Sequence, residues 1–266
     1  MLSSLSPVEG RPLVHGHRGA RAVLPENSLP AFEYAISIGV DVLELDLAVT
    51  KDDVLVVSHD PKLNPKFCRG PGGSRVIREL TFAQLRQWEC GAVANPDFPR
   101  QKAVPGTRIP FLEEVLALAP KGKFEFNIET KIFRDQPQYT PSPERFAQLL
   151  VDAIRKHGLS ARVIIQSFDF RTLRAAKAIA PEIRRSALYS GPPRDLIALT
   201  REAEASILSP EFHLVTVDIV KAAHQAGFSV VPWTANTPED WKRLVDAGVD
   251  AIISDDPAAL ISFLNR

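Results

Sequence analysis

Three short blocks near the start of the chain carry the residues that could do chemistry. His17-Arg18-Gly19 comes first, Glu44-Leu45-Asp46 follows, and His59-Asp60 completes the group. The blocks lie at the ends of apolar runs typical of strands. Two imidazoles can exchange protons near neutral pH, an arginine binds anionic oxygens, and paired carboxylates are ligands for a hard cation. This grouping indicates metal-assisted cleavage of a phosphodiester.

A later strand ends with a second set of polar side chains. Asn127, Glu129 and Lys131 share one face of that strand, because successive side chains point to opposite faces. Glu44 and Asp46 share a face for the same reason. If the strands are parallel, their carboxyl ends meet at one edge of the sheet, and we expect all these side chains to lie together there.

Three carboxylates at one edge would repel one another and be costly to bury without a neutralising charge. An all-oxygen set of Glu44, Asp46 and Glu129 suits one divalent cation, Mg²⁺ or Ca²⁺, better than Zn²⁺. The alternative is an ion-pair network with Arg18 and Lys131. We favour the metal, because the network would leave too many carboxylates in one place.

His17 and His59 are the candidates for acid–base catalysis. Phosphodiester cleavage needs one group to take a proton from the nucleophile and another to give one to the leaving alkoxide; the sequence does not tell which histidine does which. We expect Arg18 to bind the phosphate bidentately and Lys131 to add a point charge. Trp233, at the end of an apolar run, either walls the pocket or packs in the core.

Five further polar residues have competing interpretations. His15 lies one step deeper than His17 on the same strand face, and belongs either to the core or to a layer behind the site. We expect Glu26-Asn27 to order the loop after the first strand rather than to contact substrate. We expect Asp255 and Asp256, which follow the last strand, to cap the final helix.

Short apolar runs alternate with helical patterns along most of the chain. The predicted strands are residues 12–16, 42–49, 54–58, 124–130, 162–167, 184–189, 206–209, 228–233 and 251–254. The predicted helices are residues 28–39, 81–88, 142–158, 170–179, 194–203, 216–226, 238–246 and 256–264. Near-continuous Val, Ile, Leu and Phe runs are typical of buried parallel strands. Eight βα units in a chain of this length predict an α/β fold, a (β/α)₈ TIM barrel, for which about 250 residues is typical.

Two segments depart from the alternation. Residues 54–58 follow the tight turn Lys51-Asp52-Asp53 and are predicted to pair antiparallel with residues 42–49 as an extension of that barrel strand. Residues 61–110 are rich in Pro and Gly. We expect them to form a small subdomain inserted after the second barrel strand and lying over the barrel mouth, within a single catalytic domain of residues 1–266.

Composition narrows the class of partner and the compartment. The 266 residues include 32 basic and 32 acidic side chains with no basic run, which argues against nucleic acid. No apolar run reaches the roughly 18 residues of a transmembrane segment. Residues 1–11 do not resemble a signal peptide. We therefore expect a cytoplasmic protein, or a periplasmic or secreted one if the N-terminus is processed. Cys68 and Cys90 could form one disulfide, but we expect free thiols.

These motifs together resemble the glycerophosphodiester phosphodiesterase family over nearly the whole chain. The motifs that carry the resemblance are His17-Arg18-Gly19, Pro25-Glu26-Asn27-Ser28, Glu44-Leu45-Asp46, His59-Asp60, Asn127-Ile128-Glu129-Thr130-Lys131, Gln166-Ser167-Phe168, Trp233-Thr234-Ala235-Asn236 and Ile253-Ser254-Asp255-Asp256-Pro257. Each block is weak alone, but their order and placement are specific. Ser28 stands where the family more often has threonine, and the segment after Asp60 departs from its pattern.

The resemblance implies a TIM barrel with an inserted subdomain and hydrolysis of a glycerophosphodiester to glycerol 3-phosphate and an alcohol. The family's acid–base histidines fall on His17 and His59. Its metal ligands fall on Glu44, Asp46 and Glu129, and its phosphate contacts on Arg18 and Lys131. Some relatives use the substrate's own 2-hydroxyl as nucleophile.

Two other functions stay open at this level. A lysophospholipase D or phosphodiester lyase would keep the barrel but need an apolar groove for an acyl chain. A non-catalytic phosphate-binding barrel would have no use for two histidines beside three carboxylates. The sequence does not predict the oligomeric state or the alcohol.

Overall fold

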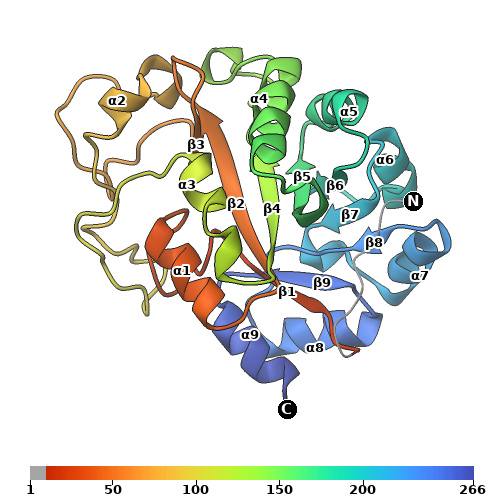
Figure 1. Cartoon of the computed structure of the whole chain (residues 1–266). Helices are drawn as coiled ribbons and strands as arrows, with labels where there is room; N and C mark the ends of the chain where they lie inside the picture. Colours follow the sequence, from red (N-terminus) through yellow and green to blue (C-terminus); the bar gives the residue numbers. More distant parts are fainter. Residues whose placement is uncertain (1–9) are drawn as a thin grey trace.

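The computed structural model describes residues 10–266 and is built on one nine-stranded sheet (Figure 1). Its strands are β1 (Leu13–Gly16), β2 (Val42–Val49), β3 (Leu55–Val57), β4 (Glu125–Thr130), β5 (Val163–Ser167), β6 (Arg184–Tyr189), β7 (Ile207–Pro210), β8 (Ser229–Val230) and β9 (Ala251–Ser254). Eight are parallel in the order β8-β7-β6-β5-β4-β2-β1-β9. The N–H groups of Asp250 and Ile253 donate to the carbonyls of Val230 and Pro232, which joins the two end strands. The predicted TIM barrel is confirmed.

The ninth strand, β3, pairs antiparallel with β2, with Leu47 opposite Val57 and Val49 opposite Leu55. This is the predicted extension of the second barrel strand. Strand β3 pairs with the carboxyl-terminal end of β2. His59 follows two residues after β3 ends at Val57. The strand extension therefore sets the position of one candidate catalytic histidine relative to the acidic pair on β2.

Helices cover the outside of the barrel (Figure 1). They are α1 (Leu29–Ser37), α3 (Leu112–Leu116), α4 (Pro143–Lys156), α5 (Phe170–Ile179), α6 (Leu196–Glu202), α7 (Val217–Gln225), α8 (Pro238–Ala247) and α9 (Pro257–Leu264). Helix α2 (Phe82–Leu85) lies apart from them, in the segment between β3 and α3. The predicted helix starts follow from capping, as where Ser28 accepts a hydrogen bond from the N–H of Ala31. Helix α2 is shorter than predicted. Helix α3 was not predicted, because five residues are too few to show a helical repeat.

Two large apolar clusters fill the layer between strands and helices, and a smaller one fills the inside of the barrel. Phe126, Phe146 and Leu150 are fully buried in the first cluster. The inner cluster consists of Leu13, Ile164, Ile207, Val231, Ala251 and Ile253. The polar side chains discussed below stand at the carboxyl ends of the strands, above this apolar plug, so the barrel acts as a rigid base for them.

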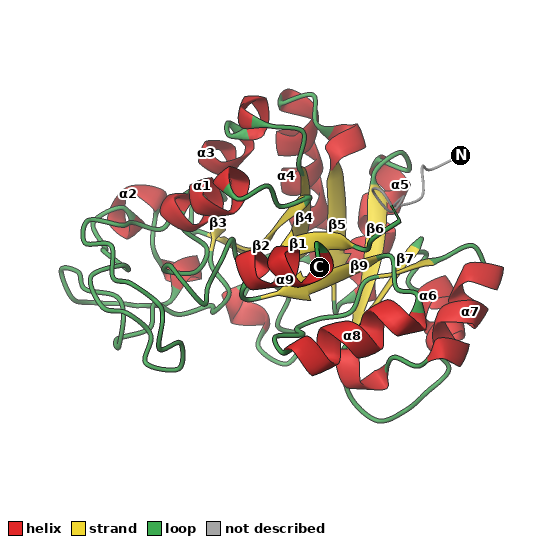
Figure 2. Cartoon of the chain, turned by 90° about the horizontal axis from the view of Figure 1, so that it is seen from below, coloured by secondary structure: helices red, strands yellow, loops and turns green. Residues whose placement is uncertain are grey.

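The segment between β3 and α3 is loop-rich and projects to one side of the barrel helices in both views (Figures 1 and 2). It has its own apolar cluster, which includes Leu63, Ile77, Leu85 and Trp88 and also contacts β2 and β3. Our expectation that residues 61–110 form a subdomain over the barrel mouth stays a prediction.

Cys68 and Cys90 form a disulfide with an S–S distance of 2.09 Å, so the expectation of free thiols is wrong. An antiparallel bridge between Arg69 and Glu89 brings the two cysteine segments together, with the Cα atoms 4.0 Å apart. This β-bridge joins two irregular segments, so no strand pattern in the sequence predicts it. The disulfide anchors the loop-rich segment across a separation of 22 residues.

Within residues 10–266, no helix has both the length and the apolar character needed to cross a bilayer. The expectation that the N-terminus lacks a signal peptide rests mainly on residues 1–9, which lie outside the described part of the chain.

Candidate active site

The turn after β1 holds His17 and Arg18 in place through two glycines. A Cβ atom at Gly16 would collide with the carbonyl oxygen of Gly19, and one at Gly19 would lie 2.8 Å from the backbone of Ala31 in α1. Arg18 itself has a φ of 51°, in the left-handed region that few non-glycine residues adopt. In this tight turn, the backbone N–H of Arg18 donates a hydrogen bond to a Glu44 carboxylate oxygen at 2.8 Å.

The three candidate metal ligands lie together at the carboxyl ends of β2 and β4. Asp46 stands opposite Glu129 in the parallel register. Glu44, Asp46 and Glu129 each offer an oxygen, all within 4.8 Å of one another, and all three residues are buried. Neutral donors orient two of them: Gln166 donates to Glu44 at 2.8 Å and Asn27 to Asp46 at 2.9 Å. The three carboxylates that the strand faces predicted to lie together do lie together, and their role as metal ligands stays a prediction.

Two cations lie among these carboxylates. Arg18 Nε is 3.0 Å from Asp46, and Lys131 Nζ is 2.8 Å from Glu129 and 3.8 Å from Asp46. The ion pairs of our alternative interpretation are therefore present. They leave three buried acids against two bases.

The pKa values of the carboxyl groups record this imbalance. Burial, and then the charge of Asp46, raises the pKa of Glu44 well above its usual range. Burial raises the pKa of Glu129 to about 7, although Lys131 opposes the shift. Burial also acts on Asp46, but Arg18 and Lys131 prevail and lower its pKa. Two of the three carboxyl groups thus hold protons more tightly than they would in water.

A hard divalent cation fits this donor set. Its ligands would be carboxylate oxygens of Glu44, Asp46 and Glu129, the atom type that Mg²⁺ and Ca²⁺ prefer. A cation that displaced the protons would also supply the missing positive charge. Hydrogen bonds from Gln166 and Asn27 already fix the orientation of two ligands, as is usual behind metal sites.

His17 has a carboxylate partner that sequence reasoning missed. Asp255, at the end of β9, lies 2.5 Å from His17 Nδ1, and its other oxygen accepts a hydrogen bond from Asn236 at 2.8 Å. His17 Nε2 faces the acidic cluster, 3.9 Å from Glu44. We expected both Asp255 and Asp256 to cap α9. Only Asp256 does so, accepting from the N–H of Ala259.

His17 and Asp255 each favour the charged form of the other. Burial lowers the pKa of His17, while the hydrogen bond with Asp255 acts the other way. Burial would raise the pKa of Asp255, but its hydrogen bond with His17 and the nearby positive charges lower it overall. Asp255 is therefore ionised over a wide pH range, and its carboxylate accepts a hydrogen bond from a protonated Nδ1 of His17.

His59 repeats the arrangement at the edge of the site. Its Nδ1 lies 2.8 Å from an oxygen of Asp60, the next residue. Its side chain is 35% exposed, against 12% for His17. Both histidines thus have a carboxylate on Nδ1, which leaves Nε2 of each ring as the nitrogen available to a ligand.

The remaining predicted residues lie around this centre. His15 is buried behind it, 3.4 Å from Asn127, whose amide group bonds to Gln166. Burial lowers the pKa of His15 to about 3, so it stays neutral. Trp233 lines the central cavity, its ring packed edge-on against Phe168 with 5.3 Å between centroids. Glu26 pairs with Arg18 at 2.7 Å, and its role in ordering the loop stays a prediction.

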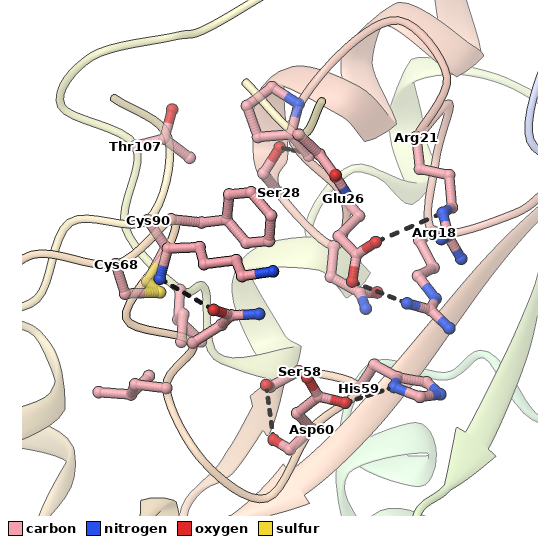
Figure 3. Close-up of a pocket in the computed structure, with 18 of the residues that line it drawn as sticks. Arg18, Arg21, Glu26, Ser28, Ser58, His59, Asp60, Cys68, Cys90 and Thr107 are labelled. Carbon is pink, nitrogen blue, oxygen red and sulfur yellow. Dashed lines mark hydrogen bonds and ion pairs between the residues drawn. A yellow bond between two sulfur atoms is a disulfide. The ribbon is translucent and has the colours of Figure 1, made fainter. Parts of the chain in front are cut away.

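Two cavities meet at the site. The central one, about 170 Å³, is lined by His17, His59, Glu129, Lys131, Phe168 and Trp233 among others. The second, about 280 Å³, extends from His59 towards the loop-rich segment (Figure 3). Arg18, Arg21 and His59 line both. Figure 3 shows Arg18 and His59 on one side of the second cavity and the Cys68–Cys90 disulfide on the opposite side.

A closed (β/α)₈ barrel with cations, histidines and buried carboxylates at its mouth suits a hydrolase of phosphoric diesters, and comparison with known proteins shows that class. The model of the glycerophosphoryl diester phosphodiesterase family matches residues 17–259. A glycerophosphodiester phosphodiesterase of Caldanaerobacter subterraneus subsp. tengcongensis is 33% identical over 254 residues, covering 96% of this chain and 98% of that protein. This chain belongs to the glycerophosphoryl diester phosphodiesterase family, whose members hydrolyse glycerophosphodiesters.

Solved structures show the same fold. A crystal structure from Silicibacter pomeroyi DSS-3, of a protein provisionally named a glycerophosphoryl diester phosphodiesterase, is 30% identical. It has a TM-score of 0.90 and covers 99% of this chain and 96% of that one. An Oleispira antarctica phosphodiesterase, in complex with its product sn-glycerol-3-phosphate, is 24% identical with a TM-score of 0.81, covering 96% and 98% of the two chains.

Proposed function

We propose that this enzyme hydrolyses small glycerophosphodiesters to glycerol 3-phosphate and an alcohol, in a reaction that requires a divalent cation and divides proton transfer between His17 and His59. The observation that carries the proposal is the pair of carboxylate-oriented histidines beside three buried carboxylates. The product named for the Oleispira antarctica structure supports the choice of substrate class.

Charge balance supports binding of a phosphodiester at this point. Three ionised carboxylates with Arg18 and Lys131 carry a net charge of minus one. A divalent cation changes this to plus one, which the single negative charge of a phosphodiester neutralises. Arg18 has a planar group that can bridge two phosphate oxygens, and Lys131 offers a point charge from the other side.

Glu44, Asp46 and Glu129 would hold the cation. When bound, such an ion lowers the pKa of a coordinated hydroxyl group and polarises phosphoryl oxygens. Whether the ion is Mg²⁺ or Ca²⁺ depends on coordination number, which the three carboxylates alone leave open.

The histidines move the protons. Asp255 accepts a hydrogen bond from Nδ1 of His17, and Asp60 accepts one from Nδ1 of His59. Nε2 of each ring is therefore free to carry or accept a proton. Cleavage needs a base for the attacking oxygen and an acid for the leaving one, so one ring enters the reaction neutral and the other protonated. We assign this pair of roles to the two histidines jointly.

A central cavity of about 170 Å³ supports a short polyol arm rather than a long acyl chain. Pockets for drug-sized ligands are larger, about 300–1,000 Å³. We therefore place a lysophospholipase D activity second. A comparison of lysophosphatidylcholine with glycerophosphocholine as substrates separates the two, and a faster turnover of the lysolipid would reverse the order.

The disulfide bears on the compartment. Structural disulfides form and persist in oxidising surroundings and are rare in a reducing cytoplasm. We propose an oxidising compartment for this protein, in place of the cytoplasmic one expected from the sequence. Thiol alkylation before lysis, followed by mass spectrometry of the Cys68 and Cys90 peptides, tests this proposal, because alkylated thiols on both peptides would contradict it.

The function is tested with sn-glycero-3-phosphocholine, by measuring release of glycerol 3-phosphate and choline. Removal of metal with EDTA should abolish release and added Mg²⁺ or Ca²⁺ restore it. His17→Ala and His59→Ala should each lower kcat by about 10²- to 10⁴-fold. His224→Ala is the matched control, because this exposed histidine on α7 pairs with Asp250 at the opposite end of the barrel. Equal activity in all four proteins would overturn the proposal.

A further inference from the structure

The second cavity adjoins the proposed phosphate-binding residues, and much of its lining comes from the loop-rich segment. Its volume is about 280 Å³, and it shares Arg18, Arg21 and His59 with the central cavity. A phosphate held at this shared wall has two ester arms. If the proposed function is right, the glycerol arm lies beside the carboxylates and the alcohol arm enters the second cavity.

Several of the neutral polar side chains of this cavity are already engaged in hydrogen bonds. Gln101 uses its amide to donate to the carbonyl of Arg21 and to accept from the N–H of Asn95. Thr107 donates to the carbonyl of Val104. Asn27 both donates to Asp46 and accepts from its N–H. Asn64 and Asn95 each accept a backbone hydrogen bond at Oδ1 and form no hydrogen bond through the side-chain NH₂ group within residues 10–266. Selection of the alcohol therefore rests on these two donors, which like cations suit an anionic group, on the charged groups and on the apolar wall.

Among the charged side chains that line the cavity, more cations than carboxylates lack an ion-pair partner within residues 10–266. The carboxylates of Glu26 and Asp60 are engaged, by Arg18 and His59 respectively. Lys66 and Arg108 also line the cavity, and neither has a carboxylate partner within 4.0 Å among residues 10–266.

One more cation and one acid complete the charged lining. The ammonium group of Lys62 lies 4.8 Å from the centre of the Tyr139 ring and forms no ion pair with any described residue. Asp97 is the remaining carboxylate of the lining, and it too forms no ion pair within residues 10–266. The cavity therefore offers three cations free of carboxylates against one free acid.

We propose that the alcohol moiety preferred by this enzyme is anionic: a phosphorylated or carboxylated alcohol, whose charged group lies between Lys66 and Arg108. A quaternary ammonium group, such as that of choline, would instead place a positive charge beside these cations. The apolar wall of Leu63, Phe67 and the disulfide would contact the carbon skeleton of the alcohol.

The test compares substrates that share the glycerophosphoryl arm and differ in the charge of the alcohol. Glycerophosphoinositol 4-phosphate and glycerophosphoinositol have the same ring, and glycerophosphocholine supplies the cationic alcohol. Partly exposed ion pairs contribute up to about 1 kcal/mol each, or about fivefold. Two such pairs predict that kcat/KM for the phosphorylated substrate exceeds that for the neutral one several-fold, up to about 25-fold. Raising the salt concentration from 0.05 to 0.5 M (about 14 to 4 Å in screening length) should shrink the ratio.

Lys66→Gln and Arg108→Gln should each lower this ratio several-fold. Lys102→Gln is the matched control, because Lys102 is an exposed lysine of the same segment that does not line the cavity. A wild-type ratio near one, a preference for glycerophosphocholine, or a preference unchanged in both variants would overturn the inference and leave the proposed function intact. Failure to cleave any of the three substrates would instead refute the proposed function.

Discussion

Replacing Asp255 by asparagine should separate orientation of His17 from stability of the fold. Asp255 is only 7% exposed and has a carboxylate oxygen on each of two partners, His17 Nδ1 at 2.5 Å and the Asn236 amide at 2.8 Å. In the variant, the side-chain oxygen would keep the bond from Asn236, so the new NH₂ group would face His17. An NH₂ group donates, and would force the ring into the tautomer with its proton on Nε2.

The magnitude follows from the hydrogen bond that is lost. A hydrogen bond to a charged group contributes about 1.5–3 kcal/mol, and about 1.4 kcal/mol corresponds to a tenfold change in rate. Asp255→Asn should therefore lower kcat by about 10- to 100-fold. KM should change little, because Asp255 acts on substrate only through His17.

The assay is steady-state release of glycerol 3-phosphate, with thermal unfolding measured on the same samples. Asp256→Asn is the matched control, because asparagine is also a good N-cap and should keep the bond to Ala259. The control should retain near-full kcat even if loss of its ion pair with Arg100 lowers Tm slightly. A kcat for Asp255→Asn within twofold of the parent enzyme would refute the orienting role.

Three further outcomes are expected. Changing both Cys68 and Cys90 to serine should destabilise the loop-rich segment by about 3 kcal/mol in urea unfolding, the loop-closure value for a separation of 22 residues; an unchanged midpoint would contradict this. A carboxyl group whose pKa is higher in the folded protein than in the unfolded chain contributes stability at low pH that is lost as the pH rises. The raised pKa of Glu44 and that of Glu129, about 7, therefore predict that added Mg²⁺ increases Tm more at pH 8 than at pH 5.5, and equal shifts would count against the site. Lys131→Gln should reduce kcat/KM at least about 10-fold, and parent-like kinetics would remove this lysine from phosphate binding.

The fold and the acidic cluster could be predicted because both depend on periodic patterns. Alternation along β2 and β4 put Glu44, Asp46 and Glu129 on inward faces, and parallel pairing put those faces at one barrel mouth. The apolar runs and the glycine-terminated helices were enough to predict the order of the strands and of the helices other than α3. Such local rules hold wherever a strand or helix is long enough to show its repeat.

The parts that could not be predicted depend on contacts between distant segments. Asp255 and Asp256 both precede a helix that begins with Pro257, which is a strong capping signal, but a helix uses only one N-cap residue. The surplus acid was the available signal, and its partner, His17, lies 238 positions away. The disulfide likewise depends on a bridge between two irregular segments, in which no periodicity marks the partners.

Anomalous diffraction from crystals of the enzyme soaked in Mn²⁺ would test the central claim most directly, since Mn²⁺ shares the oxygen-ligand preference of Mg²⁺ and Ca²⁺. We predict one ion at the mouth of the barrel, with oxygen atoms of Glu44, Asp46 and Glu129 all about 2.0–2.6 Å away. An ion that lacks any of these three ligands, or no ion at this site under conditions in which the enzyme is active, would contradict the account.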